Sequence, residues 1–256
     1  MKGASPTWLL TRRTLTQFPR NPIVVGFAVP PVLMMFVVFG TLFASVRHLP
    51  GFPTDNYYEY LAPAAVLMTT IPGIANSAVG LATDFQSRYL YKLLTTPASI
   101  GAIMLGRLLA DSARLFITGG VVLLLALALG GQIATGFAGA LLMLLIATLF
   151  AMVTFGVLTA NLAIKTKDPA AVQAVFPMAF LLVFLTTAYQ TQDQVESGLL
   201  RAIMDANPTE YVLRAMRDLM LTGYDWDAIG LAFLVILGLG LIGIPLTIRN
   251  YRSVYR

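Results

Sequence analysis

Long stretches without a charged side chain constrain this chain more than any other feature of its sequence. A charge near the middle of a lipid bilayer costs several kcal/mol unless it is paired or hydrated, so charge-free runs of about 20 residues are typical of membrane-spanning helices. Such runs cover residues 23–46, 60–83, 115–164, 169–192 and 228–248.

The third run is too long for one span. Gly130, Gly131 and Gly136 interrupt it together with polar residues, which predicts two helices joined by a tight turn. We therefore expect an all-α integral membrane protein, with one transmembrane domain over residues 1–256. Six transmembrane helices are expected at 23–46, 60–83, 107–129, 137–164, 169–192 and 227–248.

Composition narrows the chemistry. Only 11% of the residues are charged, against about 25% in ordinary soluble domains, and the short loops leave no room for a soluble catalytic domain. The chain has no cysteine, and His48 is its single histidine, which excludes disulfides, thiolate metal sites and zinc sites built from several histidines. We expect no catalytic residue, metal or cofactor in this chain. We expect the protein to contact the lipid bilayer and to bind no nucleic acid.

The placement of lysine and arginine predicts the orientation. With six spans both termini lie on one side, and that side carries 12 of the 17 basic residues, whereas the other side carries four. The positive-inside rule places the richer side in the cytoplasm. We therefore predict a multi-pass protein with both termini cytoplasmic.

Two further segments are expected at the membrane surfaces. Residues 5–20 favour a helix in the cytoplasmic interface, although a plain basic flank has the same composition. Within 199–223, Asn207 and Pro208 predict a helix start and Gly223 its end. This helix is too short to cross the bilayer, so we expect it in the outer interface or dipping into it as a re-entrant half-helix. Its predicted polar face carries Glu210, Arg214, Arg217 and Asp218.

Residues 84–99 form the first cytoplasmic loop and are predicted to hold a short helix that Pro97 ends. Its apolar and tyrosine side chains stand beside a cationic rim, which suits insertion into a groove on another protein. A turn lying on the membrane surface explains the same pattern equally well. The predicted contact residues are Arg88, Tyr89, Leu90, Lys92, Leu93, Leu94 and Pro97.

Few polar side chains lie inside the expected spans. Asp111 and Arg114 share a helix face in the third span, which favours a structural ion pair over a proton relay. The uncharged polar residues either line a substrate path or bond to their own helix backbone. These candidates are Asn76, Ser77, Thr186, Thr187 and Gln190.

Short motifs follow one another along nearly the whole chain. They are Arg20-Asn21-Pro22 before the first span, Lys92-Leu93-Leu94-Thr95-Thr96-Pro97 in the first loop, Asp168-Pro169 before the fifth span and Asn207-Pro208-Thr209 in the last outer segment. In this order they resemble the membrane permeases of type-2 ATP-binding-cassette (ABC) exporters. Within that family the chain looks closest to the daunorubicin-resistance type of drug efflux permease.

The resemblance implies a permease of the bacterial plasma membrane that acts in multidrug efflux and antibiotic resistance. It implies a dimer with a second copy or a similar permease, and docking of cytosolic ABC ATPase subunits, which bind ATP and Mg, on the 84–99 helix. The sequence has no Gly-x-x-x-x-Gly-Lys-[Ser/Thr] loop to cradle phosphates, so we predict that this chain is not itself the ATPase.

The charge-free spans favour a hydrophobic or amphipathic substrate, such as a drug or a lipid-like molecule. Export of a polysaccharide or a glycolipid is the alternative within the same class. A non-transport membrane scaffold or an intramembrane enzyme is the alternative of a different class. An enzyme needs convergent carboxylates, histidines or Ser–Lys pairs at one depth, and the sequence shows no such set.

Overall fold

The computed structural model describes residues 30–87, 100–189 and 191–253, and the regular structure in these ranges is helical. Within these described ranges, three helices are long and apolar enough to cross a membrane: Ala110–Ala128, Gly136–Thr166 and Trp226–Asn250. Leu33–Leu42 and Pro169–Phe184 are shorter apolar helices. The all-α membrane fold class is thus confirmed, and the count of six spans stays a prediction.

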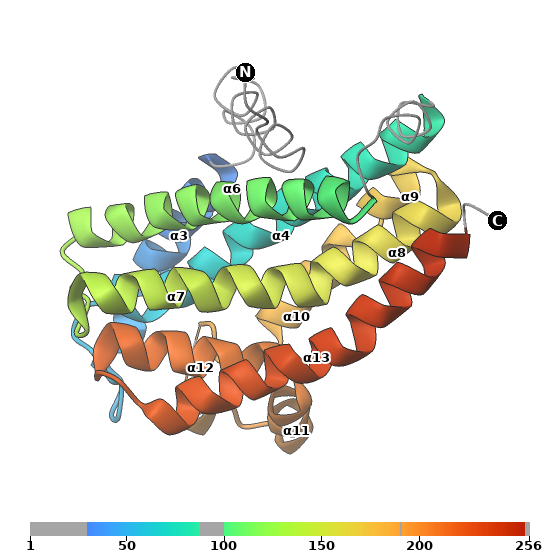
Figure 1. The fold of residues 1–256 in the computed structure, drawn as a ribbon. Helices are drawn as coiled ribbons and strands as arrows, with labels where there is room; N and C mark the ends of the chain where they lie inside the picture. Colours follow the sequence, from blue (N-terminus) through green and yellow to red (C-terminus); the bar gives the residue numbers. More distant parts are fainter. Residues whose placement is uncertain (1–29, 88–99, 190, 254–256) are drawn as a thin grey trace.

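The helices form a bundle in which α4 packs against α6, α7 and α8, and α13 packs against α8 and α12 (Figure 1). A single π-helical turn, η2, joins α7 to α8, so the fourth span is continuous. In chain order the helices are α3 (Pro30–Leu42), η1 (Ala44–His48), α4 (Tyr57–Gln86), α6 (Ile100–Ala128), α7 (Gly136–Ala151), η2 (Met152–Gly156), α8 (Val157–Thr166), α9 (Pro169–Gln173), α10 (Phe176–Phe184), η3 (Gln192–Gln194), α11 (Gly198–Ala206), α12 (Pro208–Leu221) and α13 (Trp226–Ser253).

Helix α4 forms the centre of the core. All its residues from 60 to 70 are buried, and it contacts α3, α6, α7, α10 and α12. Small residues such as Ala62 and Ala64 let the neighbouring helices approach closely. On the outside of the bundle, α6 and α13 expose large apolar side chains, such as Leu124 (66% exposed) and Leu241 (77% exposed), as expected for a surface that meets lipid.

Hydrogen bonds tie the helix ends together at one end of the bundle, which we name the outer end from the predicted orientation. Glu59 Oε1, near the start of α4, accepts a bond from the backbone N–H of Gln132 in the turn between α6 and α7 (2.8 Å). The same turn holds the end of α12, because the Ala134 N–H donates to the carbonyl of Met220 (2.9 Å). The predicted turn at Gly130 and Gly131 is confirmed.

At the opposite, inner end, the turn between α8 and α9 packs against the end of α4. Lys167 adopts the left-handed conformation (φ 53°) that closes α8, and Asp168 caps α9 by accepting a bond from the Ala170 N–H. The Lys167 ammonium lies 5.9 Å from the centre of the Phe85 ring. Helices α8 and α9 are therefore attached to the last turn of α4.

Helices α8 and α13 meet along a seam of close backbone contact. A Cβ atom at Gly243 would lie only 2.6 Å from Cγ1 of Val157. Beside it, Asn161 Nδ2 donates to Thr247 Oγ1 (2.8 Å), and Asn250 Nδ2 donates to Asn161 Oδ1 (2.7 Å). Small residues and side-chain hydrogen bonds are the usual means by which helices associate in a membrane.

Some predicted boundaries were wrong. The fifth helical stretch ends at Phe184 rather than near residue 192, and residues 185–189 are not helical. The first helix ends at Leu42, with the short 3-10 helix η1 after it. Segment 199–223 divides into α11 and α12 at Asn207. The predicted helix at 5–20 lies outside the described residues.

We expect Gly243→Ala to destabilise the protein, because the new methyl group must displace Val157 from the seam. Overpacking of this kind costs about 1–3 kcal/mol, so the thermal unfolding midpoint in detergent should fall. Gly238→Ala is the matched control in the same helix, since a Cβ atom there meets no other atom within 4 Å. Equal midpoints for the two variants would contradict the close seam.

Candidate functional site: a polar joint at the outer end

Helix α10 ends at Phe184, and the non-helical segment that follows needs hydrogen-bond partners for its backbone groups. A helix end leaves backbone carbonyls without partners, and inside a membrane there is no water to satisfy them. Non-helical backbone at such a depth is tolerated only where protein buries it or where it lines a water-filled cavity. The partners of residues 182–189 are therefore the groups to identify.

Asn207 serves two helices at once. Its side-chain Oδ1 accepts a bond from the Thr209 N–H (2.9 Å), which caps the start of α12 as the sequence predicts. Its Nδ2 donates to the carbonyls of Leu182 (2.6 Å) and Leu185 (2.8 Å) at the end of α10. One amide thus joins the end of α10 to the beginning of α12.

Thr187 is the centre of the contacts that follow. Its N–H and its hydroxyl both donate to the Glu210 carboxylate, at 2.7 and 2.8 Å. Arg217 donates through Nη1 to the Thr187 hydroxyl and through Nη2 to its carbonyl, both at 2.8 Å. The Tyr60 hydroxyl donates to the same carbonyl (2.8 Å). We call Tyr60, Thr187, Asn207, Glu210 and Arg217 the outer joint.

Aromatic side chains of α4 complete the attachment. The Arg217 guanidinium lies 3.9 Å from the centre of the Tyr60 ring, a cation–π contact. One turn earlier, the Tyr57 hydroxyl donates to the carbonyl of Tyr189 (2.7 Å). The segment after α10 is thereby fixed to α4 on one side and to α12 on the other.

The burial of two charged residues in the outer joint contradicts the predicted polar face of this helix. Glu210 is 1% exposed and Arg217 is 9% exposed. The amphipathic pattern assigned both to the outward side, but they turn inward because Thr187 supplies them with partners. Arg214 does lie at the surface, where its Nε donates to Glu210 Oε1 (2.8 Å). The sequence did carry one signal for this burial: Glu210 and Arg217 have opposite charges and stand seven residues apart, on one face of a helix that starts at Asn207-Pro208.

The residues proposed to line a path fall in different places. Thr186 and Thr187 are buried and make hydrogen bonds within the chain, and the Thr186 hydroxyl donates to the carbonyl of Val183 in the last turn of α10. Asn76 and Ser77 belong to α4, but their side chains lie outside the described ones, as does Gln190. A role in the path remains a prediction for this set.

Asp111 and Arg114 lie on α6, as predicted, and Asp111 is 8% exposed. Both take part in interactions within the protein. The predicted contact residues for a partner protein, 88–97, lie outside the described residues; the helices before and after them, α4 and α6, end at Gln86 and begin at Ile100.

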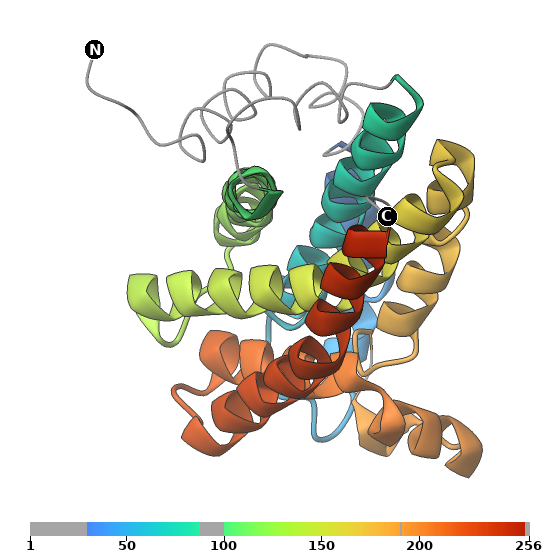
Figure 2. The ribbon, with the colours of Figure 1, turned by 45° about the vertical axis from the view of Figure 1, so that its right-hand side comes forward.

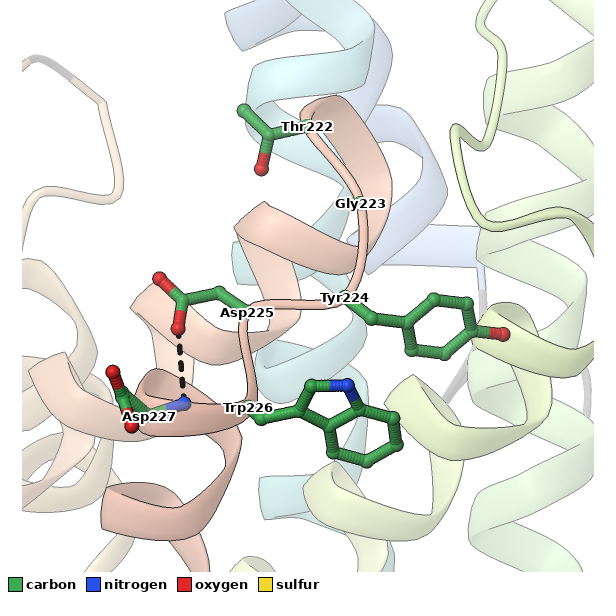
Figure 3. Close-up of a pocket in the computed structure, with 6 residues that line it drawn as sticks. All are labelled: Thr222, Gly223, Tyr224, Asp225, Trp226 and Asp227. Atoms are coloured by element: carbon green, nitrogen blue, oxygen red, sulfur yellow. Dashed lines mark hydrogen bonds between the residues drawn. The ribbon is translucent and has the colours of Figure 1, made fainter.

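A shallow pocket lies where α12 turns into α13 (Figure 3). The rings of Tyr224 and Trp226 stack with centroids 5.6 Å apart and point to one side, whereas the carboxylates of Asp225 and Asp227 point to the other. Asp225 accepts bonds from the N–H groups of Asp227 and Ala228, which caps α13. The arrangement is a helix start with an aromatic pair, a pairing typical of a membrane surface.

We expect Arg217→Leu to destabilise the protein by about 3 kcal/mol or more, because it removes a buried cation and the two hydrogen bonds that this cation donates to the Thr187 hydroxyl and carbonyl. Arg214→Leu is the control on the same helix: its side chain is 43% exposed, so water partly replaces its bond to Glu210, and Glu210 keeps both bonds from Thr187. We therefore expect a smaller loss of stability than for Arg217→Leu. Thermal unfolding in detergent measures both. Similar losses would contradict the importance of the outer joint.

Burial raises the pKa of the Asp218 carboxyl, and repulsion from Asp225 adds to the rise. A carboxyl whose folded-state pKa is raised stabilises the fold below its unfolded pKa, and this stability is lost as the pH rises through the folded pKa. We therefore expect the thermal midpoint of the native protein to fall relative to that of Asp218→Asn over this window. A constant difference between the two proteins would contradict the raised pKa.

The comparisons with known proteins agree with this architecture. Residues 6–221 match the family model of the ABC-2 type transporter. The chain is 26% identical over 247 residues, which is 94% of its length and 84% of the relative's, to "Daunorubicin resistance ABC transporter permease protein DrrB1" of Streptomyces coeruleorubidus. It is 25% identical over 221 residues, 85% of its length and 77% of the relative's, to "Probable doxorubicin resistance ABC transporter permease protein DrrC" of Mycobacterium tuberculosis. A family match over most of the chain, on an all-helical membrane fold, shows that this protein belongs to the ABC-2 type transporter family and is a membrane permease.

Proposed function

We propose that this permease exports hydrophobic or amphipathic compounds, of the drug or lipid-like class, across the plasma membrane of a bacterium. The observation that carries the proposal is the family match together with relatives whose names refer to daunorubicin and doxorubicin resistance. The charge-free spans support it, since an apolar route suits a substrate that already partitions into lipid.

Membership of the family implies an ABC ATPase subunit as partner. We propose that this subunit binds ATP and Mg and that it docks on residues 84–99 of the permease. We also propose that two permeases, either two copies of this chain or this chain and a similar one, form the membrane unit. Both termini are then cytoplasmic, on the side of the ATPase.

The packing at the inner end supports the proposal that movement of the docked ATPase is transmitted to the membrane helices. The 88–99 segment follows the last turn of α4, and Phe85 in that turn lies beneath the Lys167 ammonium. A buried cluster that includes Leu81, Phe85, Ile164 and Val172 joins α4 to α8 and α9. Displacement of the end of α4 is therefore passed directly to the fourth and fifth helical stretches.

The first experiment is purification of the native complex. We expect an ABC ATPase subunit to copurify with the tagged permease, and export of a fluorescent anthracycline from cells to require both subunits. Export of a hydrophilic sugar polymer alone, with no effect on hydrophobic drugs, would contradict the proposed substrate class.

The second experiment reverses charge on the proposed docking helix. Arg88→Glu with Lys92→Glu should leave the permease folded and should reduce export at least several-fold, because the cationic rim no longer fits its partner. Arg47→Glu, an exposed residue at the outer end, is the control for charge reversal. Normal drug export by the double variant would contradict docking through this segment.

A further inference from the structure

Helix α12 enters the bundle from the outer end and does not lie across it. Its C-terminal carbonyl groups at Leu219 and Met220 accept bonds from the turn between α6 and α7. Its N-terminal cap, Asn207, contacts the end of α10. In both views α12 runs beside α7 (Figures 1 and 2). Its 14 residues, at about 1.5 Å each, span about 21 Å.

The stacked pair at the start of α13 marks the membrane surface at the outer end. Tyr224 is 43% exposed and Trp226 is 70% exposed, and exposed Tyr and Trp residues gather where a membrane meets water. The apolar stretch of α13 begins immediately afterwards, at Ala228. The N-terminus of α12 is therefore about 20 Å below this surface along the helix axis. The headgroup layer accounts for only about 5–8 Å of that depth.

Polar residues are exposed at this depth, on the flank formed by residues 191–205 and α12. The Gln192 amide donates to Asp205 (2.9 Å) and accepts from Arg214 (2.8 Å), and Arg214 lies 3.8 Å from Asp205. We call the exposed polar side chains of residues 191–205, together with Arg214, the polar flank; Leu199 and Ile203 of α11 are exposed beside them, at 74% and 39%. The exposed charged side chains on it are Asp193, Glu196, Arg201, Asp205 and Arg214.

Contact with lipid would be unfavourable for the charged side chains of the polar flank. Charged side chains inside a membrane face protein or a water-filled cavity, because the hydrocarbon cannot solvate them. The segment before α11 is also largely non-helical, and non-helical backbone obeys the same rule. By contrast, α13 presents Leu234 and Leu237 at similar depth, 65% and 60% exposed.

We infer that water enters the membrane from the outer end and reaches the level at which α10 ends, and that the polar flank lines this water. The inference rests on the proposed function, for which the flank forms the outer part of the export route. On α10 just below it, the exposed side chains of Met178, Leu181 and Phe184 are apolar. An amphipathic substrate that follows this surface outward passes from the apolar side chains of α10 to the hydrated, charged side chains of the polar flank.

The absence of cysteine from the whole chain allows a direct test. Single variants of the full exporter in intact cells are treated with a membrane-impermeant, cationic thiol reagent. Asp205→Cys probes the polar flank. Leu237→Cys is the matched control, because it lies about 16 Å along α13 from Trp226 and is exposed toward lipid. Gln132→Cys, in the exposed turn between α6 and α7, probes the outer surface.

We expect Asp205→Cys to be modified at a rate within about tenfold of Gln132→Cys, and Leu237→Cys to remain unmodified until the membrane is dissolved. Protection of Asp205→Cys while Gln132→Cys reacts would overturn the inference and leave the proposed function intact. Equal reaction of Leu237→Cys would also overturn it, since water would then not be confined to the polar flank. Protection of Gln132→Cys would refute the orientation, and with it the proposed function.

A transport measurement tests the place of the flank on the route. Modification of Asp205→Cys should reduce drug export several-fold, because a bulky cation then occupies the hydrated wall. Modification of Gln132→Cys should leave export unchanged. Normal export after complete modification at position 205 would refute the assignment of the flank to the export route.

Discussion

Peptide groups that leave a helix within a membrane must find partners in the protein, and the outer half of this permease is organised around that requirement. Helix α10 ends at Phe184. The groups exposed by its end and by the segment after it are satisfied by Asn207, the cap of α12, by Glu210 and Arg217 of α12 and by Tyr60 of α4. The fifth helical stretch can therefore stop short of the surface only because α12 is inserted beside it.

The charges of the outer joint are linked through a neutral group. Arg217 donates to the Thr187 hydroxyl, which in turn donates to Glu210, so the hydroxyl relays the attraction between two buried charges. Charge-assisted hydrogen bonds are about twice as strong as neutral ones. The seam between α8 and α13 at the inner end instead depends on Gly243 and on uncharged amides and hydroxyls. Charge-assisted hydrogen bonds therefore hold the outer end of the bundle together, whereas close packing and neutral hydrogen bonds hold the inner end.

Features that depend on local chemistry could be predicted from the sequence, such as the turn at Gly130 and the start of α12 at Pro208. The end of α10 could not, because residues 169–192 are uniformly uncharged and the partners that replace its helical bonds lie 22 to 30 residues further along the chain or, for Tyr60, 127 residues earlier. The inward direction of Glu210 was missed for the same reason: amphipathic reasoning places every charge of a helix in water unless a buried partner is known.

Asn207 is followed by Pro208, and this order protects the asparagine side chain from deamidation. Asparagine ages by deamidation when the next backbone nitrogen attacks its side-chain amide, and a proline nitrogen carries no hydrogen for that reaction. A carboxylate formed there would face the carbonyl oxygens of Leu182 and Leu185, which now accept from the amide. The residue that starts α12 therefore also shields the joint from slow covalent decay.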